Sequence, residues 1–152
     1  MIIIGYQGIG KSTLGGKCGC IDLESSSFYI TGERDPNWYE VYCKIAESLS
    51  RQGYVVFVSS HKEVQDRLEK SKEYICAIYP DKPLKELWID KLKARYEKDK
   101  SRKNLAAYRN AEQRFDYSIE QLSNYKRDKF VITEIGYSLV DIINMLKSKY
   151  GR

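Results

Sequence analysis

The sequence contains few residues that could build a disulfide or a zinc site. Its four cysteines, Cys18, Cys20, Cys43 and Cys76, form no C-x-x-C pair, and His61 is the only histidine. Zinc sites are usually built from such pairs together with further cysteines or histidines. We therefore expect no zinc site and reduced thiols, with Cys43 and Cys76 in the core.

Long apolar runs are missing as well. No run approaches the about 18 residues of a membrane-spanning helix, and Met1 leads directly into a short apolar segment without a basic leader or a cleavage site. We expect a cytoplasmic protein with no membrane partner. At 152 residues the chain fits one domain, so any further part must be an insertion within it.

The charge balance is only moderately basic. The formal net charge is +5, from 26 basic and 21 acidic residues. A surplus of this size suits phosphorylated small molecules as well as nucleic acid, so charge alone does not choose between these partners.

Five short apolar runs predict buried strands, and helical patterns separate them. The runs are residues 2–4, 20–23, 54–58, 74–79 and 130–133. Strands that alternate with helices form parallel sheets covered on both faces, so the predicted fold class is α/β. Helices are expected from residue 11, from residue 36, from residue 60, over residues 84–96, over residues 108–122 and from residue 139.

Three details of these helices are specific enough to check. The first helix should be unusually short because Gly15 and Gly16 follow its start almost at once. The helical spacing places Tyr39 and Leu49 on the inward face of the second helix, and Leu87 on that of the fourth. A polar stretch at residues 99–104 should separate the fourth helix from the fifth.

Residues 5–12 read G-Y-Q-G-I-G-K-S, a complete match to the phosphate-binding loop pattern G-x-x-x-x-G-K-[ST]. Glycines at 5, 8 and 10 allow backbone N–H groups to curl around an anion, and a helix that begins at Lys11 adds its positive end. An ordinary glycine-rich turn is the alternative. It is disfavoured because an apolar strand precedes the loop and a helix start follows it.

The loop pattern predicts a binder of nucleoside triphosphates. Lys11 is placed to reach the β- and γ-phosphates of ATP, and the Ser12 hydroxyl to ligate Mg²⁺. The predicted nucleotide-binding residues are Gly5, Tyr6, Gln7, Gly8, Ile9, Gly10, Lys11, Ser12 and Thr13.

An acidic pair ends the second apolar run. Asp22 and Glu24 point to the same side of an extended strand, at the carboxyl end where ligands of parallel sheets bind. Such a pair can hold Mg²⁺ through water and hydrogen-bond an acceptor hydroxyl. The structural alternative is that Asp22 caps the following turn, where residues 25–27 supply hydroxyls. We favour a catalytic and metal-binding role for Asp22, and take Glu24 and Ser27 as candidates for substrate binding.

The segment after the fourth apolar run is strongly basic. Seven basic and two acidic residues lie between positions 91 and 103, and Arg95, Arg102 and Arg109 are spaced seven apart. The three arginines share a face if one helix runs through, or lie on two arms of a flap if the helix breaks. In either case they can close on a triphosphate and neutralise the transferred phosphoryl group. A solvated charged face is the alternative to this catalytic role, for which Arg95 and Arg102 are the candidates.

Two further residues are candidates for substrate binding. His61 follows the third apolar run, at the same predicted edge of the sheet as Asp22, although a capping motif over residues 60–63 explains Ser60 by itself. Trp38 lies off the inward stripe of its helix and can stack on an acceptor.

A second acidic metal ligand is missing from its usual place. No Asp ends the third apolar run, where many P-loop ATPases carry one. The metal shell must therefore draw on Asp22, Glu24, Glu134 or water.

These motifs together resemble the nucleoside monophosphate kinases and small-metabolite kinases, a group of P-loop proteins, and most closely the short phage-type nucleotide kinases. The resemblance rests on G-Y-Q-G-I-G-K-S-T at residues 5–13, C-I-D-L-E-S-S at 20–26, V-F-V-S-S-H-K at 56–62, and an arginine-containing lid around 95–109. It spans nearly the whole chain, and only the first motif is specific.

The resemblance implies a three-layer P-loop fold with a five-stranded parallel sheet of order 2-3-1-4-5. Residues 1–152 would form a single domain, with a helical lid inserted over about residues 84–125. The resemblance also implies ATP and Mg²⁺ on Lys11 and Ser12, and an acceptor between the second helical region and the lid. Asp22 would lie at the acceptor and metal, Arg95 and Arg102 in the lid, and residues 134–137 near the adenine.

The predicted function is transfer of the γ-phosphoryl group of Mg-ATP to a small phosphorylated acceptor, with a (deoxy)nucleoside monophosphate ahead of a sugar. A kinase of nucleic-acid 5′ ends is one alternative, which the basic lid and the abundant aromatic residues permit. A nucleotide-dependent switch or regulatory ATPase is another. The sequence indicates no oligomeric state.

Overall fold

The computed structural model of the chain describes residues 1–25, 29–30 and 33–150. Among these described residues, no helix is long and apolar enough to cross a membrane. In chain order the elements are β1 (Ile2–Gly5), α1 (Lys11–Leu14), β2 (Cys20–Asp22), β3 (Tyr29–Ile30), β4 (Glu33–Arg34), α2 (Trp38–Arg51), β5 (Val55–Val58), α3 (Lys62–Leu68), β6 (Ile75–Pro80), the 3-10 helix η2 (Lys82–Leu84), α4 (Lys85–Lys98), α5 (Arg102–Ser123), β7 (Asp128–Ile132) and α6 (Leu139–Tyr150).

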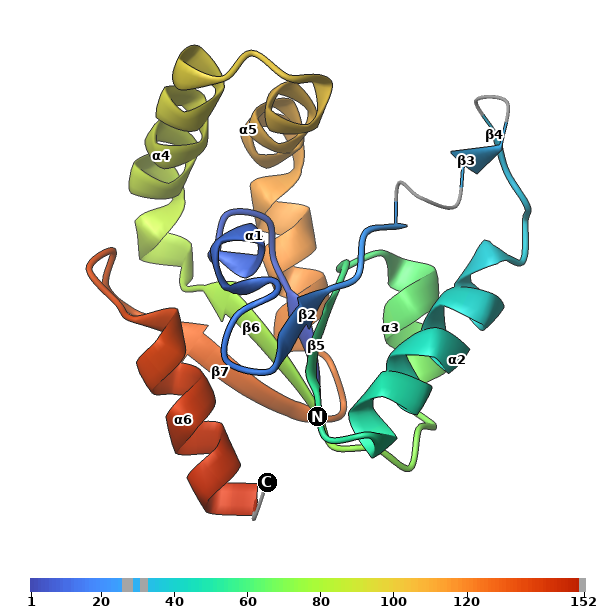
Figure 1. Ribbon diagram of the computed structural model, residues 1–152. Helices are drawn as coiled ribbons and strands as arrows, with labels where there is room; N and C mark the ends of the chain where they lie inside the picture. The colour runs from blue at the N-terminus through green and yellow to red at the C-terminus, as the bar shows by residue number, and fades with distance from the viewer. Residues whose placement is uncertain (26–28, 31–32, 151–152) are drawn as a thin grey trace.

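Five strands form one parallel sheet in the order β2-β5-β1-β6-β7 (Figure 1). These are the five predicted strands in the order 2-3-1-4-5, so the α/β class and the strand order are confirmed. In the centre of the sheet, Ile3 pairs with Phe57 on one side and with Cys76 on the other. The short antiparallel pair of β3 and β4 is an addition that the apolar runs did not predict.

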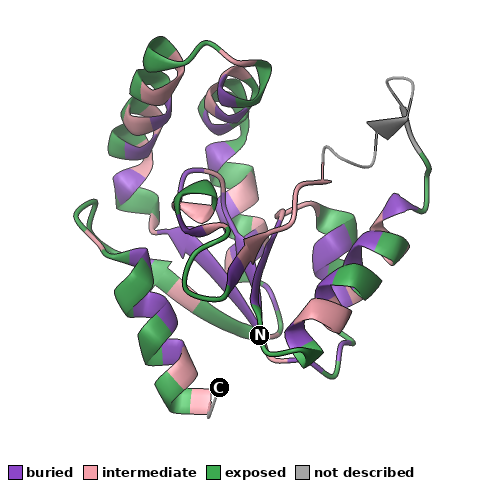
Figure 2. Cartoon of the chain, in the orientation of Figure 1, coloured by how far each residue is buried: buried purple, intermediate pink, exposed green. Residues whose placement is uncertain are grey.

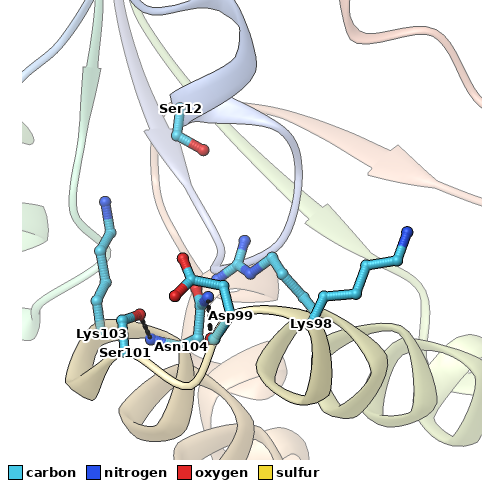
Figure 3. Close-up of a pocket in the computed structure, with 7 residues that line it drawn as sticks. Ser12, Lys98, Asp99, Ser101, Lys103 and Asn104 are labelled. Atoms are coloured by element: carbon cyan, nitrogen blue, oxygen red, sulfur yellow. Dashed lines mark hydrogen bonds between the residues drawn. The ribbon is translucent and has the colours of Figure 1, made fainter.

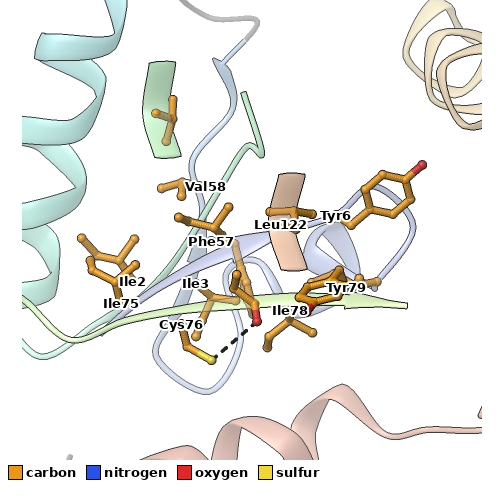
Figure 4. Close-up of a cluster of buried hydrophobic side chains, with 14 of the residues drawn as sticks. Ile2, Ile3, Tyr6, Phe57, Val58, Ile75, Cys76, Ile78, Tyr79 and Leu122 are labelled. Carbon is orange, nitrogen blue, oxygen red and sulfur yellow. Dashed lines mark hydrogen bonds between the residues drawn. The ribbon is translucent and has the colours of Figure 1, made fainter. Parts of the chain in front are cut away.

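The centre of the sheet is buried because helices cover it from both sides. The edge strand β7 is largely exposed, so the prediction that it is buried is wrong. Strands β1, β5 and β6 are buried along their whole length, and Figure 2 shows them as the buried centre of the molecule. Helices α2 and α3 lie on one side of the sheet and α6 on the other (Figure 1). Leu122 of α5 belongs to the same buried cluster as the strand residues Phe57 and Val58 (Figure 4). The predicted burial of Cys43 and Cys76 is confirmed.

The first helix has a single turn, as predicted. It begins after Gly10, whose φ of 111° is open to glycine and strained for other residues, and it ends at Gly15. A Cβ atom at Gly15 would lie 2.9 Å from Cβ of Asp22. The close approach of these two segments therefore requires a glycine, and it places the end of α1 against the end of β2.

Helix α2 begins later than its sequence suggests. The Asp35 carboxylate accepts a hydrogen bond from the backbone N–H of Asn37 at 2.8 Å, and the first helical residue is Trp38. Tyr39 and Leu49 pack against the core, so the predicted inward face is confirmed, whereas the prediction that Trp38 lies off this face is wrong. Tyr39 and Leu49 are half-buried, and Trp38 is 6% exposed.

Helices α4 and α5 pack side by side. Helix α4 and the start of α5 lie beyond the carboxyl ends of the strands, and the rest of α5 runs behind the sheet (Figure 1). The predicted break between them is confirmed, because Ser101 caps α5 by accepting a hydrogen bond from the backbone N–H of Asn104. The side chain of Asn104 also donates to the carbonyl oxygen of Asp99 at 2.8 Å. The prediction that Leu87 faces inward is wrong, since Leu87 is exposed and the neighbouring Trp88 is fully buried.

Candidate functional site

A cleft of about 1120 Å³ opens at the carboxyl edge of the sheet. Its floor comes from the loop after β1 and from the residues that follow β2 and β5, and its opposite wall comes from α5. This edge is where ligands of open parallel α/β sheets bind. Among the predicted site residues, the cleft is lined by Gln7, Gly8, Gly10, Lys11, Ser12, Asp22, Glu24, His61, Arg95 and Arg102.

The floor of the cleft is the glycine-rich loop, residues 5–10. Gly8 and Gly10 have φ angles of 89° and 111°, which side chains disfavour. At Gly5 an added Cβ would lie 2.5 Å from Cδ1 of Ile9. The backbone therefore curls as the glycine spacing predicts, and each of the three positions has its own steric reason for glycine.

Lys11 stands at the start of α1, half-buried inside the curl of the loop. Its Nζ donates a hydrogen bond to the carbonyl oxygen of Gly5 at 2.9 Å. Burial lowers the pKa of Lys11 to about 8, while the nearby Asp22 and Glu24 act in the opposite direction. An ammonium group in this position is short of solvation, so an incoming anion would stabilise its charged form.

The acidic pair faces Lys11 across the cleft. Asp22 and Glu24 both line the cleft, as expected if they point to one side of the strand. Burial raises the pKa of Asp22, Lys11 opposes this rise, and Glu24 adds to it. Glu24 also forms an ion pair with Lys103 of α5.

The same region can supply oxygen ligands for a metal ion. No group of three or more His, Cys, Asp or Glu side chains suited to a metal occurs in the part of the chain that the structure describes. The Ser12 hydroxyl and the Asp22 carboxylate are hard oxygen donors that fit Mg²⁺. Mg²⁺ usually keeps several waters and binds through one or two carboxylates and the phosphates of its substrate, so a sparse protein shell suits this ion. Glu134 is exposed and is not among the residues that line the cleft.

The lid arginines lie on two arms, as expected for a broken helix. Arg95 of α4 and Arg102 of α5 both line the cleft, whereas Arg109 is exposed elsewhere on α5. Arg95 also lines a smaller pocket of about 340 Å³ beside Ser12, at the turn between the two helices (Figure 3). Within the described residues, Nε of Arg95 is buried without a hydrogen-bond partner. An anion bound beside Arg95 would supply the missing hydrogen-bond acceptor.

His61 and Trp38 lie together, but in different environments. Nδ1 of His61 is 2.7 Å from Oγ of Ser59, and its ring lies edge-on to Trp38 at 5.2 Å between centroids. His61 lines the cleft, whereas Trp38 packs in the core beneath it. The N-cap residue of helix α3 is His61, and its side chain makes no capping hydrogen bond. The capping box predicted over residues 60–63 is therefore wrong. The candidate Ser27 falls outside the described residues.

The far end of the cleft contains residues that the sequence did not single out. Tyr117 is 53% exposed, with the guanidinium of Arg114 4.8 Å from its ring centroid. Gln121 donates to the Tyr117 hydroxyl at 3.1 Å. On the opposite wall, Gln65 is 3% exposed and, within the described residues, its Oε1 lacks a hydrogen-bond partner. This end therefore offers amide and aromatic groups together with the charge of Arg114.

The signal for these residues is weak in the sequence. Arg114, Tyr117 and Gln121 follow one another at helical spacing. They form a polar stripe beside the apolar stripe of the same helix, and polar stripes usually mean only a solvated face.

No protein-family model, curated protein or solved structure matches the chain.

Proposed function

We propose that the chain is a P-loop phosphotransferase, which moves the γ-phosphoryl group of Mg-ATP to a small phosphorylated acceptor. A nucleoside monophosphate is the first candidate for that acceptor. The observation that carries the proposal is the position of Lys11, which lies within the curled glycine-rich loop and faces Asp22 across one cleft.

The donor end of the cleft supports a polyphosphate ligand. The curled loop and the first turn of α1 line the cleft, where their backbone N–H groups would bind phosphate, and Lys11 adds a half-buried positive charge. Bound phosphate would draw Lys11 away from the carbonyl oxygen of Gly5 and restore its ordinary pKa. Ser12 and Asp22 would hold Mg²⁺, which supplies charge neutralisation at the β- and γ-phosphates.

The size of the cleft supports two ligands at once. Sites for one small molecule usually measure about 300–1,000 Å³, and this cleft measures about 1120 Å³. The charged end suits the triphosphate, while the end with Gln65 and Tyr117 suits a base or sugar. Donor and acceptor phosphates would then meet between Lys11 and Asp22.

The protein would do little covalent chemistry in this reaction. Its part is to align the acceptor oxygen with the γ-phosphate and to spread the developing charge over cationic groups. Arg95 and Arg102 approach the cleft from two helices and are placed to neutralise that charge. Asp22 is placed to accept a hydrogen bond from the acceptor.

The test is ADP formation that depends on an acceptor. Purified protein is incubated with Mg-ATP and a panel of mononucleotides, nucleosides, sugars and oligonucleotides. We expect one mononucleotide to stimulate ADP formation, and Lys11→Met to lower that rate about 10²–10³-fold. Lys93→Met, which changes an exposed lysine of α4, serves as the matched control. Stimulation by no acceptor, or an undiminished rate in Lys11→Met, would refute the proposal.

A kinase of nucleic-acid 5′ ends is the second candidate, because Tyr117 is exposed beside Arg114 at the cleft. An exposed aromatic ring next to a cation is a typical stacking platform for single-stranded nucleic acid. This candidate requires turnover with oligonucleotides, salt-sensitive binding and no turnover with free mononucleotides. Turnover of mononucleotides alone would exclude it.

A further inference from the structure

We infer that Trp88, Lys91 and Tyr137 form a clamp, which holds the glycine-rich loop from behind and presets its N–H groups for phosphate. Lys91 acts in this clamp as a positioning residue, because it contacts the loop and not the ligand. The inference rests on the proposed function, in which the loop receives the phosphates of ATP.

The clamp consists of three donors on three consecutive carbonyl groups. Nε1 of Trp88 donates to the carbonyl oxygen of Gln7 at 2.8 Å, and Nζ of Lys91 donates to that of Gly8 at 2.7 Å. The Tyr137 hydroxyl donates to the carbonyl oxygen of Ile9 at 2.7 Å. The donors come from α4 and from the loop before α6, so two distant segments hold one turn of backbone.

Peptide geometry converts these contacts into an orientation of the N–H groups. The peptide bonds of the loop are trans, and in a trans peptide the carbonyl and the following N–H point in opposite directions. The N–H groups of Gly8, Ile9 and Gly10 therefore face away from the clamp. The Ile9 N–H donates to the carbonyl oxygen of Tyr6 at 3.4 Å, whereas none of the described residues accepts a hydrogen bond from the N–H of Gly8 or Gly10.

The charge of Lys91 strengthens this arrangement. Its Nζ lies 4.4 Å from the ring centroid of Trp88 and 5.1 Å from that of Tyr137, which hold the ammonium against the carbonyl of Gly8. A cation at the oxygen end of a peptide dipole and an anion at its N–H end favour the same orientation. Burial, with Arg95 adding to it, lowers the pKa of Lys91, and burial raises the pKa of Tyr137 to about 12, so the hydroxyl remains a donor at neutral pH.

Packing alone does not explain this use of a lysine. A half-buried ammonium loses hydration, and an apolar side chain would fill the same space at a smaller cost. The close contact also depends on Gly8, where an added Cβ would lie 3.0 Å from both Nε1 of Trp88 and Cδ2 of Leu92. The backbone thus approaches α4 closely enough for the ring and the ammonium to reach the carbonyl groups.

The test compares Mg-ATP with Mg-tripolyphosphate, which lacks base and sugar, by calorimetric titration. We expect Lys91→Met to weaken both ligands by the same factor of about 10–100, because one hydrogen bond to a charged group is lost behind the loop. Tyr137→Phe, which keeps the ring, should weaken both ligands less, and Lys91→Arg should retain most of the affinity. Lys93→Met on the same helix is the matched control and should bind as the wild type does.

A second readout follows the loop directly. In ¹H–¹⁵N spectra, tripolyphosphate should shift the amide signals of Gly8 and Gly10 in the wild type, and Lys91→Met should alter both signals before ligand is added. These spectra also report whether each variant is folded. If Lys91→Met is unfolded, Tyr137→Phe tests the clamp in its place.

The outcomes separate this inference from the proposed function. If Lys91→Met loses affinity for Mg-ATP but not for Mg-tripolyphosphate, Lys91 acts through the base or sugar. If Lys91→Met binds both ligands as the wild type does, Lys91 does not position the loop. Either result overturns this inference and leaves the proposed function in place. Binding of tripolyphosphate without transfer to any acceptor would refute the kinase proposal and leave the clamp in place. A wild-type protein that binds neither ligand would overturn both.

Discussion

Lys103, at the start of α5, forms an ion pair with Glu24, just beyond the end of β2, across 79 residues of sequence. The pair joins the lid to the floor beside the acidic end of the cleft. The positive charge of Lys103 lowers the pKa of Asp22 and also that of Lys11. Helix α5 therefore interacts electrostatically with the floor of the cleft.

This ion pair should contribute little to stability. The side chain of Lys103 is 59% exposed and that of Glu24 is 39% exposed, and such pairs contribute about 0.2–1 kcal/mol. We predict a coupling energy in this range from a double-mutant cycle of Lys103→Ala and Glu24→Gln, measured by urea unfolding. A coupling energy above about 2 kcal/mol would mean that the pair behaves as a buried one.

The affinity for Mg-ATP should fall as the pH rises above about 8. Lys11 has a pKa of about 8 in the free protein, and phosphate binds its protonated form. Binding above this pH therefore requires proton uptake, which lowers the affinity by up to about tenfold per pH unit. The measurement is the Kd at pH 7, 8 and 9. The slope should vanish in Lys11→Met, and a slope that survives in this variant would assign the titration to another group.

Removal of Lys11 should stabilise the fold. Its pKa is lower in the folded protein than the about 10.4 of an unfolded chain, so below pH 8 the folded state bears the full cost of a desolvated charge. Between pH 8 and about 10.4 the folded state loses its proton first, and wild-type stability rises with pH. We predict that Lys11→Met raises the free energy of unfolding by about 1–3 kcal/mol at pH 7, and by less at pH 9.5. Urea unfolding at both values checks this. A variant less stable than the wild type at pH 7 contradicts the prediction.

Gly8→Ala should destabilise the protein more than Gly16→Ala. Both glycines have positive φ, at 89° and 82°, so both substitutions strain the backbone by about 1 kcal/mol. Only Gly8 has close neighbours, with Trp88 and Leu92 each 3.0 Å from an added Cβ, whereas Gly16 faces open space. We expect an additional loss of about 1–2 kcal/mol for Gly8→Ala, measured as the difference in urea unfolding midpoints. Equal losses of stability in the two variants would show that Trp88 and Leu92 of α4 move aside without a free-energy cost.

Arg95 and Arg109 provide a matched pair for the catalytic role of the lid. Arg95 lines the cleft and Arg109 does not. If the proposed transfer occurs, Arg95→Ala should lower kcat by about 10²–10³-fold, since one cation is lost from the transition state, and Arg109→Ala should leave kcat unchanged. Steady-state rates with the acceptor identified by the panel check this. Equal kcat values for the two variants would place the neutralising charge elsewhere.

Local sequence patterns predicted the sheet more accurately than the helix faces. A buried parallel strand is a short apolar run, so the five strands and their order could be predicted from chain order and family resemblance. Trp38, the first residue of α2, lies off the stripe that helical spacing turns inward. It is nevertheless buried, because its ring packs edge-on against Tyr42 and His61, and His61 comes from a distant part of the chain.

The site shows the same division. The curl of the glycine-rich loop and the shared side of Asp22 and Glu24 follow from spacing within a few residues, and both were predictable. The facing walls, with Arg114 and Tyr117 of α5 on one side and Gln65 of α3 on the other, were not predictable. Two helices far apart in sequence must first be packed across the cleft.

The sequence by itself determined the α/β class, the short first helix and the composition of the loop, because each depends on local spacing and backbone freedom. The strand order was predicted only from the resemblance to P-loop kinases. Only the tertiary structure decided which side chains lie behind the loop. Trp88 is 81 residues from Gln7 and Tyr137 is 128 residues from Ile9. Hydrogen bonds between such distant residues depend on how α4 and the segment before α6 pack at the edge of the sheet.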